Sequence, residues 1–212
     1  MGSGRVTRAG GQTMTTRIGV IAGAIALLAT IGIANAQLAP QWGTCTGASD
    51  IEWKQQISAC TTLINSGRET AHNLTIAYIN RGLAYYSIKN FERAIEDDTA
   101  AIRLDPRNKS AYFNRGLAYK NSGDLDRGLS DYSTAIRLDP KFGSAYVARG
   151  NVYGIKKDFD RAIKDYDQAI KLNPKDALAY MNRGRTKEDK GDKAGAEADL
   201  AIAKRLNPSI DR

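Results

Sequence analysis

Four short strings decide the fold of this 212-residue chain: AYINRG at residues 77–82, AYFNRG at 111–116, AYVARG at 145–150 and AYMNRG at 179–184. Each string begins 34 residues after the one before it, and four of the five prolines keep the same spacing. These prolines are Pro106, Pro140, Pro174 and Pro208. A fixed period of this length is typical of a repeat protein, in which units of one kind stack along the chain.

Each 34-residue unit is predicted to contain two helices. In the second unit, apolar residues recur at helical spacing from Ser110 to Ser122, and Gly123 with Asp124 marks the break before the second helix. Pro140 then stops the chain, because proline cannot extend a helix. One hairpin leaves an apolar face bare, so the units must stack to bury it. The expected units are 75–108, 109–142, 143–176 and 177–210.

From residue 75 to residue 208, the sequence resembles the tetratricopeptide repeat family. The third unit matches the family's aromatic and small positions with Tyr146, Gly150, Tyr153, Ala162, Tyr166, Ala169 and Pro174. The resemblance implies an all-α protein, a right-handed solenoid of antiparallel helix hairpins. Two departures leave this expectation intact: Gly128 replaces the alanine of the second unit, and Asp98 replaces an aromatic residue of the first.

Both ends of the array are atypical, as the ends of repeat arrays must be. Residues 37–74 are predicted to form an N-terminal cap, in which Asp50 to Ser66 looks like the second helix of an incomplete earlier unit. This helix aligns with the first unit once four inserted residues near 67–73 are allowed, pairing Trp53, Ile57, Leu63 and Ile64 with Phe91, Ile95, Ala101 and Ile102. In the fourth unit, Lys187 and Lys204 replace the tyrosine and isoleucine of earlier units, so that outer face is expected to meet water.

Residues 1–36 have the form of a secretory signal peptide. They contain no acidic residue, an apolar stretch over 18–33 and an A-x-A end at 34–36, with Met1 or Met14 as the start. The basic residues are Arg5, Arg8 and Arg17. The alternative is an uncleaved anchor, but the apolar stretch is shorter than the roughly 20 residues that span a bilayer. We therefore expect cleavage after Ala36, a periplasmic or secreted location and no stable membrane insertion afterwards.

Export permits a disulfide between Cys45 and Cys60, the chain's two cysteines. Cys60 lies about 15 Å along the predicted cap helix, and the extended residues after Cys45 can fold back across that distance. The alternative is two free thiols. With one histidine and two cysteines, the chain cannot build the usual zinc site, and we predict neither a metal nor a cofactor.

An arginine precedes each repeat glycine, and an aspartate follows sixteen residues after each arginine. The antiparallel helices of a hairpin can bring such positions together, and a guanidinium binds a carboxylate bidentately. We predict structural ion pairs, with an arginine ladder for phosphate or carboxylate ligands as the alternative. The pairs are Arg81 with Asp97, Arg115 with Asp131, Arg149 with Asp165, and Arg183 with Asp199.

Composition and motifs point away from catalysis and nucleic acid. The chain is 42% apolar and 25% charged, which fits neither a disordered nor a multi-span membrane protein. It has no serine-hydrolase elbow, phosphate-cradling loop or HExxH motif, so we predict that it is not an enzyme. Its densest basic cluster lacks an interleaved aromatic platform for bases and comprises Lys156, Lys157, Lys164, Lys171 and Lys175.

By resemblance, the first helices of the units line a concave groove that binds an extended peptide or a helix of a partner protein. Apolar residues would hold partner side chains, and amides would bond a backbone. The expected groove residues are Ile79, Asn80 and Leu83, then Phe113, Asn114 and Leu117, then Val147, Ala148 and Asn151, then Met181, Asn182 and Arg185. The alternative is that some of them pack between helices. Some members of the family bind a C-terminal carboxylate through lysines on this surface. In this sequence apolar residues occupy the first of those lysine positions, so binding of a C-terminal carboxylate is not expected.

These features predict an exported protein-binding module, an adaptor or assembly factor of the cell envelope. Two alternatives stay open. One is a structural, self-associating scaffold, which would oligomerise without a ligand. The other is binding to an anionic glycan or lipid surface through the basic third unit, which would be sensitive to salt.

Overall fold

The computed structural model of the chain describes residues 40–47 and 52–210. The predicted signal peptide, residues 1–36, lies outside the described residues, so cleavage stays a prediction. The described helices belong to one compact unit, Gln41–Arg212. Within the described ranges all regular secondary structure is helical, and no helix there is long and apolar enough to cross a bilayer.

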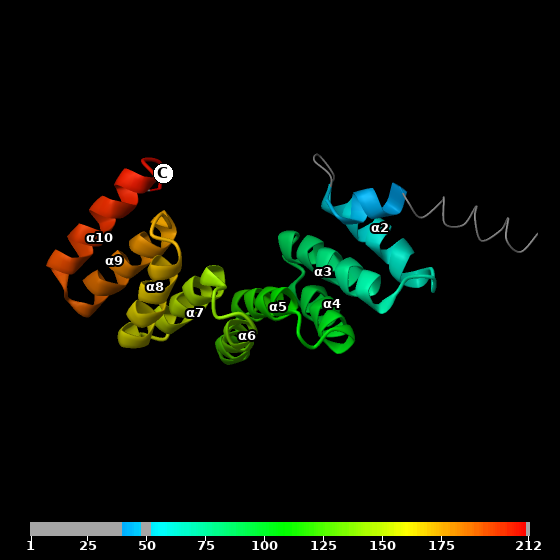
Figure 1. The fold of residues 1–212 in the computed structure, drawn as a ribbon, viewed down its shortest axis with the longest axis horizontal. Coiled ribbons are helices and arrows are strands. Elements are labelled where there is room, and N and C mark those ends of the chain that lie inside the picture. Colours follow the sequence, from blue (N-terminus) through cyan, green and yellow to red (C-terminus); the bar gives the residue numbers. More distant parts are fainter. Residues whose placement is uncertain (1–39, 48–51, 211–212) are drawn as a thin grey trace, which may run out of the picture. The chain divides into compact units, whose positions relative to one another are not determined.

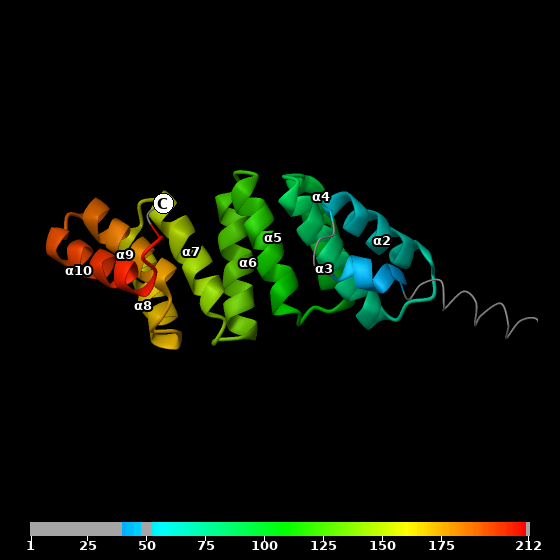
Figure 2. The same cartoon turned by 90° about the horizontal axis from the view of Figure 1, so that it is seen from above.

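Successive helices pair into hairpins, and each hairpin packs on the next (Figures 1 and 2). A short helical turn over 40–45 and helix α2 (Trp53–Asn65) precede the four hairpins. The hairpins are α3 (Ala71–Ser87) with α4 (Phe91–Leu104), α5 (Lys109–Asn121) with α6 (Leu125–Leu138), α7 (Gly143–Ile155) with α8 (Phe159–Leu172), and α9 (Ala177–Lys190) with α10 (Lys193–Leu206). The predicted all-α solenoid of helix hairpins is confirmed.

Side-chain caps explain where the helices begin. The Asp124 and Asp158 carboxylates accept hydrogen bonds from backbone N–H groups three residues later, which satisfies donors that the first turn leaves free. The Thr70 hydroxyl does the same for α3, which therefore begins at Ala71 and not at the expected unit boundary before Thr75. Part of the predicted insertion thus forms an extra first turn of α3. The cap helix begins at Trp53, three residues later than expected.

Glycine and alanine let the two helices of each hairpin approach closely. A Cβ on Gly116 would lie 2.8 Å from the Tyr132 ring, and one on Gly150 would lie 2.8 Å from the Tyr166 ring. Both tyrosines are buried, at 0% and 2% exposure. The glycines are therefore required because a large ring from the second helix fills the space in front of them.

The first hairpin has Asp98 at the position of these tyrosines. Asp98 is 1% exposed, and its Oδ1 atom has no hydrogen-bond partner in the described part of the chain. Burial raises the pKa of Asp98 well above its usual range, and the neighbouring Asp97 carboxylate raises it further. The Arg115 guanidinium lowers this pKa, and the Asp131 carboxylate raises it. Ionisation of this carboxyl therefore destabilises the hairpin.

The predicted arginine–aspartate pairs all form. The Arg115 guanidinium donates two hydrogen bonds of 2.8 Å to the Asp131 carboxylate and a third of 3.1 Å to the Thr99 hydroxyl, which lies on the second helix of the preceding hairpin. The other arginines bind in the same way: Arg81 to Asp97 and Thr61, Arg149 to Asp165 and Ser133, and Arg183 to Asp199 and Asp167. Each arginine therefore joins three helices.

Helix α2 takes the place of a second helix from a preceding hairpin. Its Thr61 hydroxyl binds Arg81 as Thr99 binds Arg115, which agrees with the alignment that allows four inserted residues. Residues 40–47 are tied to it: Cys45 and Cys60 lie at disulfide distance with their Cα atoms 4.8 Å apart, and the Gln56 amide donates to the Cys45 carbonyl over 2.9 Å.

The fourth hairpin ends the series differently. Lys187 replaces the tyrosine of earlier units and forms an ion pair of 2.8 Å with Asp199, while Lys204 is exposed. Asp199 thus binds both Arg183 and Lys187. Burial raises the pKa of Asp199, but the two cations together lower it by more, so its pKa lies below the usual value. The Lys187–Asp199 ion pair occupies the face on which a further hairpin would pack, and such packing would require an apolar surface.

Reducing the Cys45–Cys60 bond is expected to loosen the N-terminal cap. The bond closes a loop with a sequence separation of 15, and in the chain-entropy model such a loop contributes about 3 kcal/mol to the free energy of unfolding. Hydrogen exchange with and without reductant should therefore rise mainly in residues 37–70. A Cys45→Ser/Cys60→Ser variant is the control, because its exchange should not respond to reductant. Equal exchange in oxidised and reduced wild-type protein would contradict the prediction.

Arg115→Ala is expected to lower the free energy of unfolding by about 2–4 kcal/mol, because it leaves the buried Asp131 carboxylate unpaired. Arg137→Ala is the matched control: Arg137 is exposed near the end of α6 and has no ion pair with any described residue. This control should change stability by less than about 0.5 kcal/mol. Urea denaturation of both variants measures the difference. Similar small losses for the two variants would show that the pair does not hold the hairpin.

The buried Asp98 carboxyl is expected to make stability depend on pH. The folded state raises its pKa above the unfolded value of about 3.9, so its contribution is complete below the unfolded pKa and is lost as pH rises through the folded pKa. Relative to Asp98→Asn, the wild-type chain should lose about 1–3 kcal/mol of unfolding free energy between acidic and neutral pH. Urea denaturation at a series of pH values tests this, and parallel profiles would refute it.

Candidate functional site

The first helices of the hairpins form the inner side of the stack. Helix α3 contacts α5, α5 contacts α7, and α7 contacts α9, whereas the described second helices α4, α6, α8 and α10 make no comparable contacts with one another. The second helices therefore splay apart on the outer side. The first helices therefore lie next to one another, and they carry the residues that the sequence assigns to the groove.

The apolar residues that the sequence assigns to the groove differ in their solvent exposure. Leu83 is exposed, and Ile79, Val147 and Met181 are half-buried. Ala148 is 8% exposed and packs in a core cluster with Tyr132 and Val152, so its assignment to the groove is wrong. A small side chain on this side of α7 is covered by the larger ones around it.

Phe113 has a structural role as well as a partly open position. It is half-buried, and its ring lies 5.9 Å from the Tyr132 ring and 5.0 Å from the Phe142 ring, centroid to centroid. Leu117 packs on the same core cluster as Phe113. These two residues form the floor of the inner surface between the second and third hairpins, and packing between helices accounts for much of their area.

A hydrogen-bonded network that the sequence did not indicate lies in the second half of the inner surface. The Tyr166 hydroxyl donates to Asn151 Oδ1 over 2.8 Å, and Asn182 Nδ2 donates to the same oxygen over 2.9 Å. Burial raises the pKa of Tyr166 to about 12, so the hydroxyl stays protonated and remains a donor. Asn151 and Asn182 are therefore held in place by the protein itself.

In the first two hairpins, the asparagine side chains of the inner surface do not take part in such a hydrogen-bonded network. Asn80 and Asn114 are half-buried, and neither side chain makes a hydrogen bond within the described part of the chain. Each keeps an acceptor oxygen and a donor N–H₂ for another molecule. Arg185, at the far end of the surface, is exposed.

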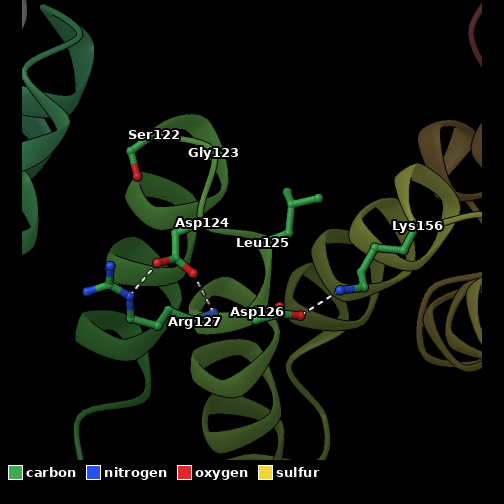
Figure 3. Close-up of a pocket in the computed structure, with 7 residues that line it drawn as sticks. All are labelled: Ser122, Gly123, Asp124, Leu125, Asp126, Arg127 and Lys156. Atoms are coloured by element: carbon green, nitrogen blue, oxygen red, sulfur yellow. Dashed lines mark hydrogen bonds and ion pairs between the residues drawn. The ribbon is translucent and has the colours of Figure 1, made fainter.

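A pocket with a volume of about 570 Å³ lies at the turn between α5 and α6 (Figure 3). Its charges pair with one another: Asp124 binds Arg127, and Asp126 binds Lys156 of α7 over 2.6 Å. These contacts cap α6 and connect two hairpins, so the pocket has a structural explanation. Among the described residues there is no group of three or more potential metal ligands.

Comparisons with known proteins agree with this geometry. A tetratricopeptide repeat family matches residues 110–142 and 143–176, and a TPR repeat family matches residues 82–123. No curated protein matches the chain significantly. Among solved structures, MamA is 23% identical with a TM-score of 0.66, over 75% of this chain and 91% of that one.

Two further structures support the same fold. YrrB, described as a TPR protein with an unusual peptide-binding site, is 18% identical with a TM-score of 0.61, covering 76% of this chain and 80% of that one. MamA from Desulfovibrio magneticus RS-1 is 16% identical with a TM-score of 0.65, covering 76% and 88%. Together with the repeat matches, these structures show that the chain carries tetratricopeptide repeats.

Proposed function

We propose that the chain is a non-enzymatic interaction module that binds a peptide segment of a partner protein along the inner surface of its first helices. The observation that carries this proposal is that the amides of Asn80 and Asn114 make no hydrogen bond within residues 40–47 and 52–210. They lie on the same two helices as the apolar residues Ile79, Leu83 and Phe113. An extended segment presents backbone groups to the amides and side chains to the apolar residues. The peptide-binding site named for YrrB supports this use of the fold.

The proposed setting is the cell envelope, where the chain would act as an adaptor or assembly factor after export. The signal-like residues 1–36 support this location. Cysteines at disulfide distance support it as well, because disulfides persist in oxidising compartments. A chain fractionated from the envelope should begin at residue 37, which N-terminal sequencing tests directly.

The partner is identified by placing a photo-crosslinking residue at position 83 of the inner surface and, as a comparison, at position 130 on the outer side of α6. Leu83 and Ser130 are both exposed. Products specific to position 83 identify the partner segment by mass spectrometry. Products that join two copies of this chain, and no other protein, would instead support the self-associating scaffold.

Asn80→Ala and Asn114→Ala are each expected to weaken binding of that segment by about 1–3 kcal/mol, because backbone groups of the partner lose their bonds. Folding stability should hardly change, because neither amide has a hydrogen-bond partner among the described residues. Ser130→Ala is the matched control. Phe113→Ala should reduce both stability and binding, because its ring packs on Tyr132 and Phe142. Calorimetric titration measures affinity, and wild-type affinity in the double amide variant would refute the proposed surface.

A further inference from the structure

The third hairpin contains a second pocket with a different character. It has a volume of about 370 Å³ and lies between α7 and α8. Its lining residues are Tyr146, Arg149 and Tyr153 of α7, and Arg161, Lys164, Asp165 and Gln168 of α8. Three cations and one carboxylate thus face one cavity, with two tyrosine rings as apolar walls.

This pocket is separate from the inner surface. At 100° per residue, Tyr146, Arg149 and Tyr153 lie on roughly the opposite side of α7 from Val147 and Asn151. The α7 residues that line the pocket are therefore on a different face of α7 from the groove residues. A ligand there would leave the proposed peptide surface uncovered.

The charges of α8 leave a positive excess at this pocket. Every aspartate of α8 and its N-cap already has a cationic partner: Asp158 with Arg161, Asp160 with Lys190, Asp165 with Arg149, and Asp167 with Arg183. Lys164 and Lys171 have no ion pair within the described part of the chain, and only Lys164 lines the pocket. Its ammonium group is thus available to an external anion.

Gln168 supplies the second free donor. It lies one helical turn after Lys164 on the same face of α8, lines the same pocket and has no hydrogen bond among the described residues. An oxyanion can accept from a cationic Nζ and from a neutral amide at once, and the charged bond is the stronger of the two. The pocket in Figure 3 differs, because its charged groups already pair with one another.

The other hairpins lack this pair of donors. At the positions of Lys164 and Gln168, the first hairpin has Glu96 and Ala100, the second has Ser130 and Thr134, and the fourth has Ala198 and Ile202. The arginine that joins three helices recurs in every unit. In contrast, a lysine and a glutamine at the positions of Lys164 and Gln168 occur only in the third unit. The repeat architecture therefore does not require them.

We propose that the pocket between α7 and α8 is an oxyanion-binding site, in which Lys164 and Gln168 hold a phosphate or carboxylate group between the rings of Tyr146 and Tyr153. This site goes beyond the proposed peptide surface and is independent of it. A phosphorylated small molecule and a carboxylate-bearing one share the required chemistry. The two sources are distinguished by titrating the full chain with inorganic phosphate and with glutarate.

Backbone amide shifts in NMR spectra provide the test, with sodium chloride at matched ionic strength as the reference. We expect saturable shifts in residues 161–168 with phosphate, glutarate or both, and the tighter binder identifies the source. Lys164→Ser with Gln168→Thr, which installs the residues of the second hairpin, should weaken binding on the order of 10-fold. Lys171→Ser is the matched control, because Lys171 is also exposed and has no ion pair among the described residues, but lies outside the pocket.

The proposal is overturned if neither anion gives a saturable shift, if chloride reproduces the shifts, or if Lys171→Ser weakens binding as much as the pocket variant. Unchanged circular dichroism spectra establish that the variants are folded. Asn80→Ala with Asn114→Ala should leave the shifts intact. Failure of this site is therefore distinguishable from failure of the inner surface.

Discussion

The arginine that joins three helices is the contact on which the rest of the structure depends. In the second hairpin, Arg115 of α5 holds Asp131 of α6 with two bonds and Thr99 of the preceding α4 with a third. One side chain thus fixes both the pairing within a hairpin and the stacking of one hairpin on the next. The same atoms donate in the other hairpins, so three of the five N–H groups of each guanidinium hold the fold together.

This repeated contact lets the inner surface vary without loss of the architecture. Successive units place Leu83, Leu117, Asn151 and Arg185 at one position, so its character changes from apolar to polar to charged along the stack. The position that holds Tyr132 and Tyr166 tolerates even Asp98, at the cost of an unpaired buried carboxyl. Functional differences between units therefore arise at positions that the arginine contact leaves free.

The sequence predicted those features that depend on spacing alone. A period of 34 residues set the hairpins, and the sixteen-residue step from Arg115 to Asp131 indicated their ion pair. It did not indicate the Thr99 bond, because that contact depends on how one hairpin stacks on the next. Nor did spacing place the start of α3, where the Thr70 cap converts part of a predicted insertion into helix. Spacing assigns Phe113 to the groove but does not show its packing, because that depends on Phe142 from the following loop.

The amide network divides the inner surface into two chemically different halves. Asn151 Oδ1 accepts from both Tyr166 and Asn182, so that oxygen is unavailable to a ligand and only the Asn151 N–H₂ remains. Asn80 and Asn114 keep both functions, and a peptide backbone offers a donor and an acceptor at each residue. Two-sided backbone pairing is therefore possible at Asn80 and Asn114 but not at Asn151, whose oxygen is already engaged. In the fourth hairpin, Asn182 keeps its oxygen and its second N–H, and Arg185 adds an exposed charge.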